Sequence, residues 1–267
     1  MFESWAWRRQ GAWGALVAIV AFSGPGAAVE VSPHRAIYDL SLASTKSSSG
    51  IVDAKGSMLL EWADSCDGWT IDQRYKLTVT NDESEESDLL VSLSSWESKD
   101  GLAYRFFSRE LRDGDMVEET RGKAHLFARG EAGEAEFVQP ETSKVDLPRG
   151  TMFPTEHTLL LIRSAEESER FLNRRVFDGG KFEGPSDVTA AIGQASPPPG
   201  ESKPMLARRS WAVRLAYYKP GATASEPDYE VGMKLLDNGV TEAMTLDYGD
   251  MVVRAKLREI EALKPNC

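Results

Sequence analysis

The two cysteines carry the most reactive side chains of the sequence. Cys66 lies in an early segment and Cys267 is the last residue. Two thiols in one chain can form a structural disulfide or a redox-active pair. Asp64 and Asp67 flank Cys66, and their negative charges oppose formation of the reactive thiolate. We therefore expect a structural disulfide between Cys66 and Cys267, with a redox-active pair as the alternative.

Metal-binding side chains do not form a motif in this sequence. The three histidines, His34, His125 and His157, lie in separate segments without the paired spacing of a zinc site. The acidic run "NDESEESD" at 81–88 has no central glycine, which a calcium loop needs at its sharp turn. We expect structural or surface roles for the histidines and a solvated loop at 81–88, with no metal and no cofactor.

The sequence also contains none of the common catalytic fingerprints. There is no G-x-S-x-G elbow for a nucleophilic serine, no phosphate-binding P-loop and no dinucleotide-binding glycine motif. "TEH" at 155–157 places an acid beside an imidazole, but its position at a predicted helix start favours a local hydrogen-bonding role for His157. We therefore assign no catalytic residue.

Aromatic side chains are the candidates for ligand contact. They lie on or beside predicted strands, where core packing is the ordinary role of such groups. In a barrel that is not fully closed, the same side chains can line an apolar cleft for a lipid, an acyl chain or a partner peptide. An exposed strand edge could also add a strand from a partner. The candidate cleft or binding aromatics are Trp62, Trp69, Trp96, Phe106, Phe153 and Trp211.

The N-terminal segment has the order of a secretory signal peptide. Arg8 and Arg9 precede the apolar run "GAWGALVAIVAF" at 11–22, and small residues follow up to Ala28. The apolar run is shorter than the roughly 20 residues of a membrane span. We expect cleavage between Ala28 and Val29, no transmembrane segment in the mature chain, and a periplasmic location. An oxidising compartment of this kind permits the disulfide.

Composition narrows the classes of partner. The net charge of −11 makes nucleic acid an improbable ligand, because phosphate binding requires surfaces rich in lysine and arginine. It also argues against broad electrostatic docking on anionic membranes.

Short alternating segments separated by turns dominate the chain. "HRAIYDLSLA" at 34–43, "WTIDQRYKLTV" at 69–79 and "RRSWAVRLAYYK" at 208–219 alternate as half-buried strands do. Asp-Gly and Asn-Gly turns such as "CDG" and "DNG" stand between them. The pattern predicts a dozen or more antiparallel strands in a sandwich or barrel.

In one segment the spacing of the apolar residues changes from the alternation of a strand to the period of a helix. Between 147 and 172, the apolar residues follow a helical stripe that includes Leu159, Ile162 and Phe171, and Pro154 suits a helix start. We expect one helix over 155–172. The loop "QASPPPGESKP" at 194–204 is read as a surface loop, so residues 29–267 are expected to form a single domain.

Several segments together resemble the EipB family of cell-envelope integrity proteins. They are "HRAIYDLSLA" (34–43), "EWADSCDGWTIDQR" (61–74), "SWESKDGLAYRF" (95–106), "LPRGTMFPTEH" (147–157) and "VFDGG" (176–180). The resemblance covers nearly all of the chain after residue 28. It implies an open, spiral-like antiparallel β-barrel with one helix, and a disulfide that maps onto Cys66 and Cys267. It implies no catalytic residues.

Together these observations predict a periplasmic, non-enzymatic protein that supports envelope integrity and resistance to envelope stress. It would act by binding an envelope protein partner or a lipid or acyl ligand. The alternative is a hydrolase or transferase acting on an envelope lipid or polymer.

Overall fold

The structure is a computed structural model that describes residues 29, 31–200, 203–221 and 226–264. Within these residues the chain forms fifteen strands and one helix, so the prediction of a mainly antiparallel β protein with a dozen or more strands and one helix is confirmed. The elements are β1 (His34–Thr45), β2 (Ile51–Asp64), β3 (Gly68–Asn81), β4 (Glu86–Ser98), β5 (Ala103–Arg112), β6 (Asp115–Leu126), β7 (Gly133–Gln139), β8 (Ser143–Leu147), β9 (Thr151–Met152), α1 (Pro154–Glu166), β10 (Phe171–Val176), β11 (Ser186–Ser196), β12 (Ser210–Tyr218), β13 (Tyr229–Leu236), β14 (Thr241–Asp247) and β15 (Met251–Ala262).

All the described strands belong to one sheet, in which almost every strand lies beside its neighbours in sequence. The first and last strands, β1 and β15, pair antiparallel and so join the two ends of the series. The two edges of the sheet are β8 and β9, which only residues 148–150 separate. The sheet therefore curls into a nearly closed barrel with one seam, which confirms the expected open barrel.

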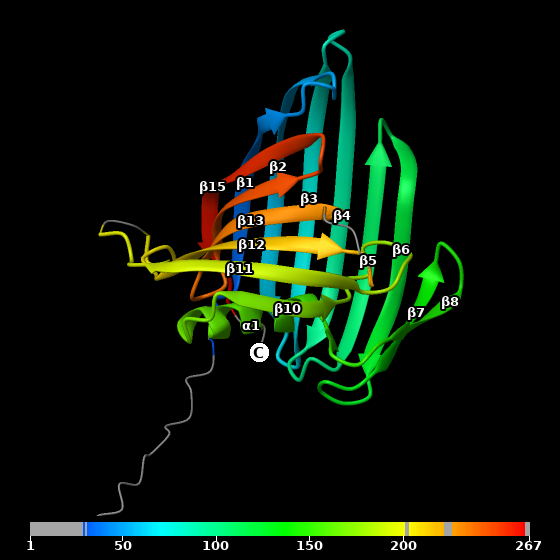
Figure 1. The fold of residues 1–267 in the computed structure, drawn as a ribbon, viewed down its shortest axis with the longest axis vertical. Helices are drawn as coiled ribbons and strands as arrows, with labels where there is room; N and C mark the ends of the chain where they lie inside the picture. The colour runs from blue at the N-terminus through cyan, green and yellow to red at the C-terminus, as the bar shows by residue number, and fades with distance from the viewer. Residues whose placement is uncertain (1–28, 30, 201–202, 222–225, 265–267) are drawn as a thin grey trace, which may run out of the picture.

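The curled sheet brings two groups of strands face to face. In Figure 1, β10 to β13 cross in front of the long strands β1 to β4 at a steep angle, and α1 lies at the lower end of the barrel. Crossed packing of this kind buries the inner faces of both layers. The main core accordingly combines Tyr38 and Leu40 of β1 with Val188 of β11 and Trp211 of β12.

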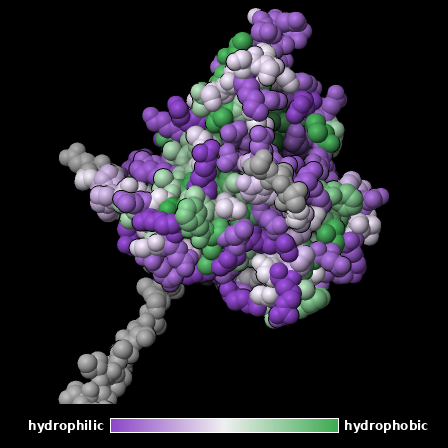
Figure 2. All heavy atoms as spheres, viewed as in Figure 1, coloured by the Kyte–Doolittle hydropathy of each residue, from purple (hydrophilic) through white to green (hydrophobic). Residues whose placement is uncertain are grey.

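Strand β1 illustrates why the sequence forms these elements. His34, Ala36, Tyr38 and Leu40 are buried, whereas the residues between them are exposed or half-buried. Successive side chains of a strand point to opposite faces, so this alternation places one face in the core. Outside the core, hydrophilic residues predominate on the face seen in Figure 2, and hydrophobic residues gather in small separate patches.

A second core lies under β5 to β8. Tyr104, Phe106, Phe137 and Phe153 pack there around Phe177, which follows β10. The Tyr104 and Phe153 rings stack with centroids 5.0 Å apart, and the Phe106 and Phe177 rings meet edge to face at 5.5 Å.

Hydrogen bonds hold the segment after β10 across this second core. The Tyr104 hydroxyl donates to the Asp178 carbonyl at 3.0 Å, and the Thr120 hydroxyl donates to the Gly179 carbonyl at 2.6 Å. Gly179 has a φ of 66°, and a Cβ there would lie 2.4 Å from the Phe106 ring, so the close approach requires glycine.

The predicted C-terminal end of the helix was wrong. The helix ends at Glu166, not at 172, because Ser168 takes a φ of 65° that a right-handed helix does not allow. Phe171 and Leu172, which extend the helical stripe in the sequence, instead begin β10 and pair with β11. The predicted start at Pro154 and Thr155 is confirmed.

The expected leader, residues 1–28, and Cys267 lie outside the described residues. In the described part of the chain, no helix is both long and apolar enough to cross a membrane.

Candidate functional site

The seam leaves part of one edge of β10 without a partner strand. The Ile192 N–H donates to the Arg170 carbonyl on the β11 side, whereas the Phe177 N–H donates to Met152 on the β9 side. Because strand residues alternate between the two sides, Phe171 and Asn173 direct their backbone groups away from β11. Strand β9 pairs only with residues 175 and 176, so no described strand pairs with the edge at 171–173, where the Asn173 carbonyl accepts only a side-chain hydrogen bond from Arg174.

The N-terminus of α1 is held by a carboxylate from a distant strand. Both oxygens of Glu97 in β4 accept hydrogen bonds from the helix, from the Thr155 N–H at 2.7 Å and the Glu156 N–H at 2.8 Å. Phe153, at the N-cap, provides no side-chain cap. Glu97 thus supplies the capping oxygens that a Ser or Asp usually provides, and its negative charge faces the positive end of the helix dipole.

Burial governs the titration of Glu97. Its side chain is 2% exposed, and this desolvation raises the pKa to about 7, although hydrogen bonds from the backbone of Glu156 and Thr155 act in the opposite direction. A carboxyl with a raised pKa in a polar region is one sign of a functional group. Here the two hydrogen bonds to α1 also give it a structural role.

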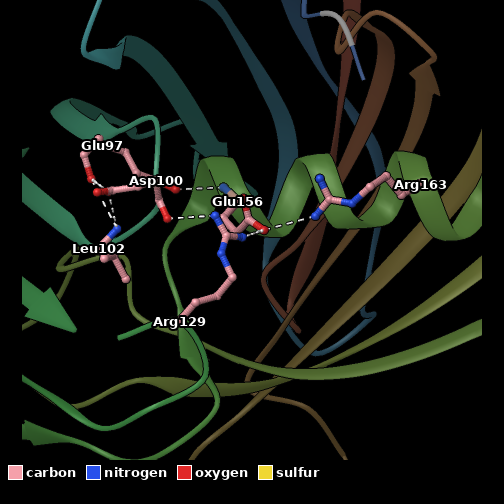
Figure 3. A network of polar contacts seen from close by, with 7 residues as sticks. Glu97, Asp100, Leu102, Arg129, Glu156 and Arg163 are labelled. Atoms are coloured by element: carbon pink, nitrogen blue, oxygen red, sulfur yellow. Dashed lines mark hydrogen bonds and ion pairs between the residues drawn. The ribbon is translucent and has the colours of Figure 1, made fainter. Parts of the chain in front are cut away.

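A chain of charged groups continues from Glu97 along the surface of α1 (Figure 3). Arg129, which follows β6, donates to Glu156 Oε1 at 2.7 Å and to the Asp100 carbonyl at 2.8 Å. Arg163, two turns further along α1, donates to the same Glu156 oxygen at 3.0 Å. Arg129 therefore links the turns after β4 and β6 to Glu156, and Glu156 joins them to Arg163 on the helix.

Asp100, Arg129 and Glu156 of this chain of charged groups line a cavity of about 760 Å³, which we call the seam cleft. The free edge of β10 forms one wall, and the turns after β4, β6 and β8 form the others. Residues of α1, β9 and β11 complete the lining. The polar and charged lining residues are Asp100, Arg129, Arg149, Thr151, Glu156, Asn173, Arg174, Arg175 and Asp187.

The charge pattern of the cleft suits an anionic group. Glu156 is paired with arginines, and Arg175 binds Asp187 at 2.9 Å. Arg174, by contrast, has no carboxylate within 4 Å among the described residues, and its guanidinium donates only to the Asn173 carbonyl at 2.7 Å. Arg174 thus offers a cation with unused donors beside the open strand edge.

The histidines do not meet in one place. His157 lies on α1 and is buried; burial, and secondarily the charge of Arg174, lowers its pKa to about 4. His34 is buried at the start of β1, where its Nδ1 lies 2.8 Å from the Ser32 carbonyl. His125 is exposed on β6. Within the described ranges, no three His, Cys, Asp or Glu side chains are placed to hold a metal ion.

The predicted aromatics occupy three environments. Trp62, Phe106, Phe153 and Trp211 are at most 5% exposed and pack in the barrel. Trp69 is half-buried beneath Lys99, whose Nζ lies 3.2 Å from the ring centroid. Trp96 is half-buried and lines a separate groove of about 610 Å³, as does Phe106. A ligand role for these six residues stays a prediction.

Sequence reasoning did not find the charged residues of the seam cleft. Glu97, which does not line the cleft but caps the helix that does, carries a signal. The inward positions of β4 include Leu89, Val91 and Leu93, and an acid in that register must find a partner. No sequence pattern marks Arg129 or Arg174, because each lies among other polar residues. The curl of the sheet alone brings them to the cleft.

Comparison with known proteins agrees with this fold. A sequence profile of the family described as EipB-like matches residues 25–264. This chain belongs to the EipB-like family. A relative named cell envelope integrity protein EipB, from Brucella abortus, is 32% identical over 243 residues, which cover 88% of this chain and 85% of that protein.

A solved structure of the same kind extends the likeness to three dimensions. It is the crystal structure of a beta-barrel-like protein of a domain of unknown function from Brucella abortus. The two chains are 31% identical and superpose with a TM-score of 0.82, covering 89% of this chain and all of the other. Sequence and fold together therefore establish that this chain is a member of the EipB-like family.

Proposed function

We propose that this protein supports the integrity of the cell envelope from the periplasm as a binding protein and not as an enzyme. The name of its Brucella relative supports the envelope role. The expected leader at 1–28 supports export, and the expected Cys66–Cys267 disulfide suits an oxidising compartment.

The observation that carries the binding mechanism is the open edge of β10 in the wall of the seam cleft. Unpaired N–H and C=O groups of a strand edge are a template for an added strand. Arg174 beside that edge would bind a carboxylate of the incoming segment. The polar lining favours an extended segment of a partner protein over an acyl chain.

A proline at the edge provides the test. Asn173→Pro removes an N–H that faces the cleft, while the β10–β11 hydrogen bonds use residues 172 and 174. Asn173→Ala keeps the N–H and is the matched control. In a host depleted of the native protein, we expect the alanine variant to restore growth on deoxycholate and the proline variant to fail, although both fold.

Full rescue by a folded Asn173→Pro variant would reject strand addition. Native mass spectrometry of protein purified from the periplasm tests the nature of the ligand in the same material. We expect no adduct of lipid mass. An adduct of that mass would contradict the peptide mechanism and favour an acyl chain in the barrel.

A hydrolase or transferase acting on an envelope lipid or polymer is the second candidate, because Glu97 is buried with a pKa of about 7. This candidate predicts that Glu97→Gln abolishes envelope protection while leaving the protein folded. The binding mechanism predicts that a folded Glu97→Gln variant protects as the wild type does, since both Glu97 oxygens serve the helix cap.

A further inference from the structure

A second groove lies on the outer face of β3 to β7, away from the buried inner faces of the barrel. Tyr104 and Phe106 of β5 are buried in the second core, so the alternate residues Arg105 and Phe107 point outward. The groove measures about 610 Å³, and we call it the outer groove. Trp96 of β4, Arg121 of β6 and Val138 of β7 also line it. The two acidic residues of the lining are already engaged, Asp72 by the Ser94 hydroxyl and Glu136 by Lys123 and Lys144.

Aromatic rings hold the arginines of the outer groove in place. The Arg105 guanidinium lies 4.8 Å from the Trp96 ring centroid, and that of Arg121 lies 5.1 Å from the Phe107 ring. A guanidinium stacked on a ring keeps the donors at its edge available while its flexible stem is restrained. Little side-chain freedom is then lost when a ligand binds.

The same two arginines have no carboxylate partner. Neither Arg105 nor Arg121 lies within 4 Å of an acidic oxygen in the part of the chain that the structure describes. Their neighbours differ in this respect. Arg109 also faces the Phe107 ring, at 5.3 Å, but binds Glu119 at 2.6 Å, and Lys123 binds Glu136 at 2.9 Å. Arg105 and Arg121 therefore present two cations without a described acidic partner on one face of the groove.

The strand register gives the spacing between the backbone positions that carry these cations. Arg105 pairs with Lys123 and Phe107 pairs with Arg121, so Arg105 and Arg121 are diagonal neighbours on one face. Diagonal neighbours in a sheet are about 7–8 Å apart. In an extended peptide, residues i and i+2 point to the same side and are separated by about 6.8 Å. The spacing of residues i and i+2 in a peptide therefore matches the spacing of the two arginine positions.

We propose that the outer groove binds an extended acidic segment of a partner protein, with carboxylates at positions i and i+2 on Arg105 and Arg121. Bidentate pairing with each guanidinium supplies the specificity. Val138, which is 51% exposed, offers an apolar contact beside them. This site is distinct from the seam cleft and does not depend on strand addition to β10.

Fluorescence anisotropy with a labelled peptide that alternates Asp and Thr tests the proposal. We expect saturable binding to the oxidised full-length mature protein that weakens with salt. Arg105→Gln and Arg121→Gln should each weaken binding about 10-fold. Arg109→Gln is the matched control, because this arginine stacks on the same ring but is already paired; it should change binding less than about 2-fold.

A peptide of the same composition with its aspartates adjacent in pairs should bind more weakly than the alternating one. The proposal is overturned if the wild type does not bind the alternating peptide, or if the Arg105→Gln/Arg121→Gln double variant binds it equally well. It is also overturned if only phosphatidylglycerol vesicles or hyaluronan tetrasaccharide bind in an Arg105-dependent manner, which would assign the groove to lipid or glycan. The Asn173→Pro variant should bind the peptide normally.

Discussion

At the scale of single residues, buried polar groups define the seam. Glu97 and His157 are both buried near the start of α1, and burial displaces their pKa values in opposite directions along the pH scale, to about 7 and about 4. Glu97 could not be assigned a role from the sequence, because it is 58 residues from Thr155, the first amide that it caps. The alternation of β4 shows only that the position is inward.

The raised pKa of Glu97 makes its contribution to stability depend on pH. The pKa rises on folding from 4.5 to about 7, so the folded protein is stabilised most below pH 4.5 and loses this stabilisation as the pH rises through 7. The loss is roughly 3 kcal/mol for a shift of this size. Glu97→Gln removes the titration. We expect the stability deficit of the variant, measured by urea unfolding, to shrink by that amount between pH 4.5 and 8.

His157 does not affect the difference in stability between the wild type and Glu97→Gln, because it titrates in both. Its lowered pKa gives a contribution that is complete above pH 6.5 and is lost as the pH falls through 4, which is the opposite sign. A deficit that stays constant from pH 4.5 to 8 would show that Glu97 keeps its charge throughout this range.

At the scale of elements, regular alternation of apolar residues predicted the long strands well. Very short strands and contacts between distant segments could not be predicted from the sequence. Strands such as β1, β3 and β12 follow directly from their apolar period. Strands β8 and β9 are five and two residues long, too short to show a period, and they are the edges that form the seam. The helix was predicted too long because Phe171 and Leu172 fit its stripe by chance.

The segment after β10 packs into the second core through Phe177. No local sequence pattern indicates this packing. Phe177 is 1% exposed and contacts the rings of Tyr104, Phe106 and Phe137. Phe177→Ala should lower the free energy of unfolding by about 3–5 kcal/mol, since it leaves a cavity among rings. Phe171→Ala, on a side chain that is 78% exposed, should change it by less than about 0.5 kcal/mol. Equal effects in urea titrations would contradict the assignment of Phe177 to the core.

At the scale of the whole molecule, the sheet explains how the last residues could reach Cys66. Trp62 of β2 and Ala262 of β15 both pair with His34 of β1, so β2 and β15 run in the same direction at the same level. Cys66 is four residues beyond Trp62, and Cys267 is five residues beyond Ala262. Two strand spacings, about 10 Å, separate the strands, and five extended residues span up to roughly 17 Å. The topology therefore supports the predicted disulfide, although Cys267 lies outside the described residues.

This pairing predicts the behaviour of a set of cysteine variants. Denatured without reductant, the mature protein should be two hydrogens lighter than its reduced form. Cys66→Ser, Cys267→Ser and the double variant should all lose the same stability, up to roughly 5 kcal/mol for a loop that closes most of the chain. The losses should coincide because either substitution removes the same bond. Additive losses in the double variant, or an unshifted mass, would mean that each thiol acts independently and that another contact must hold β15 against β1.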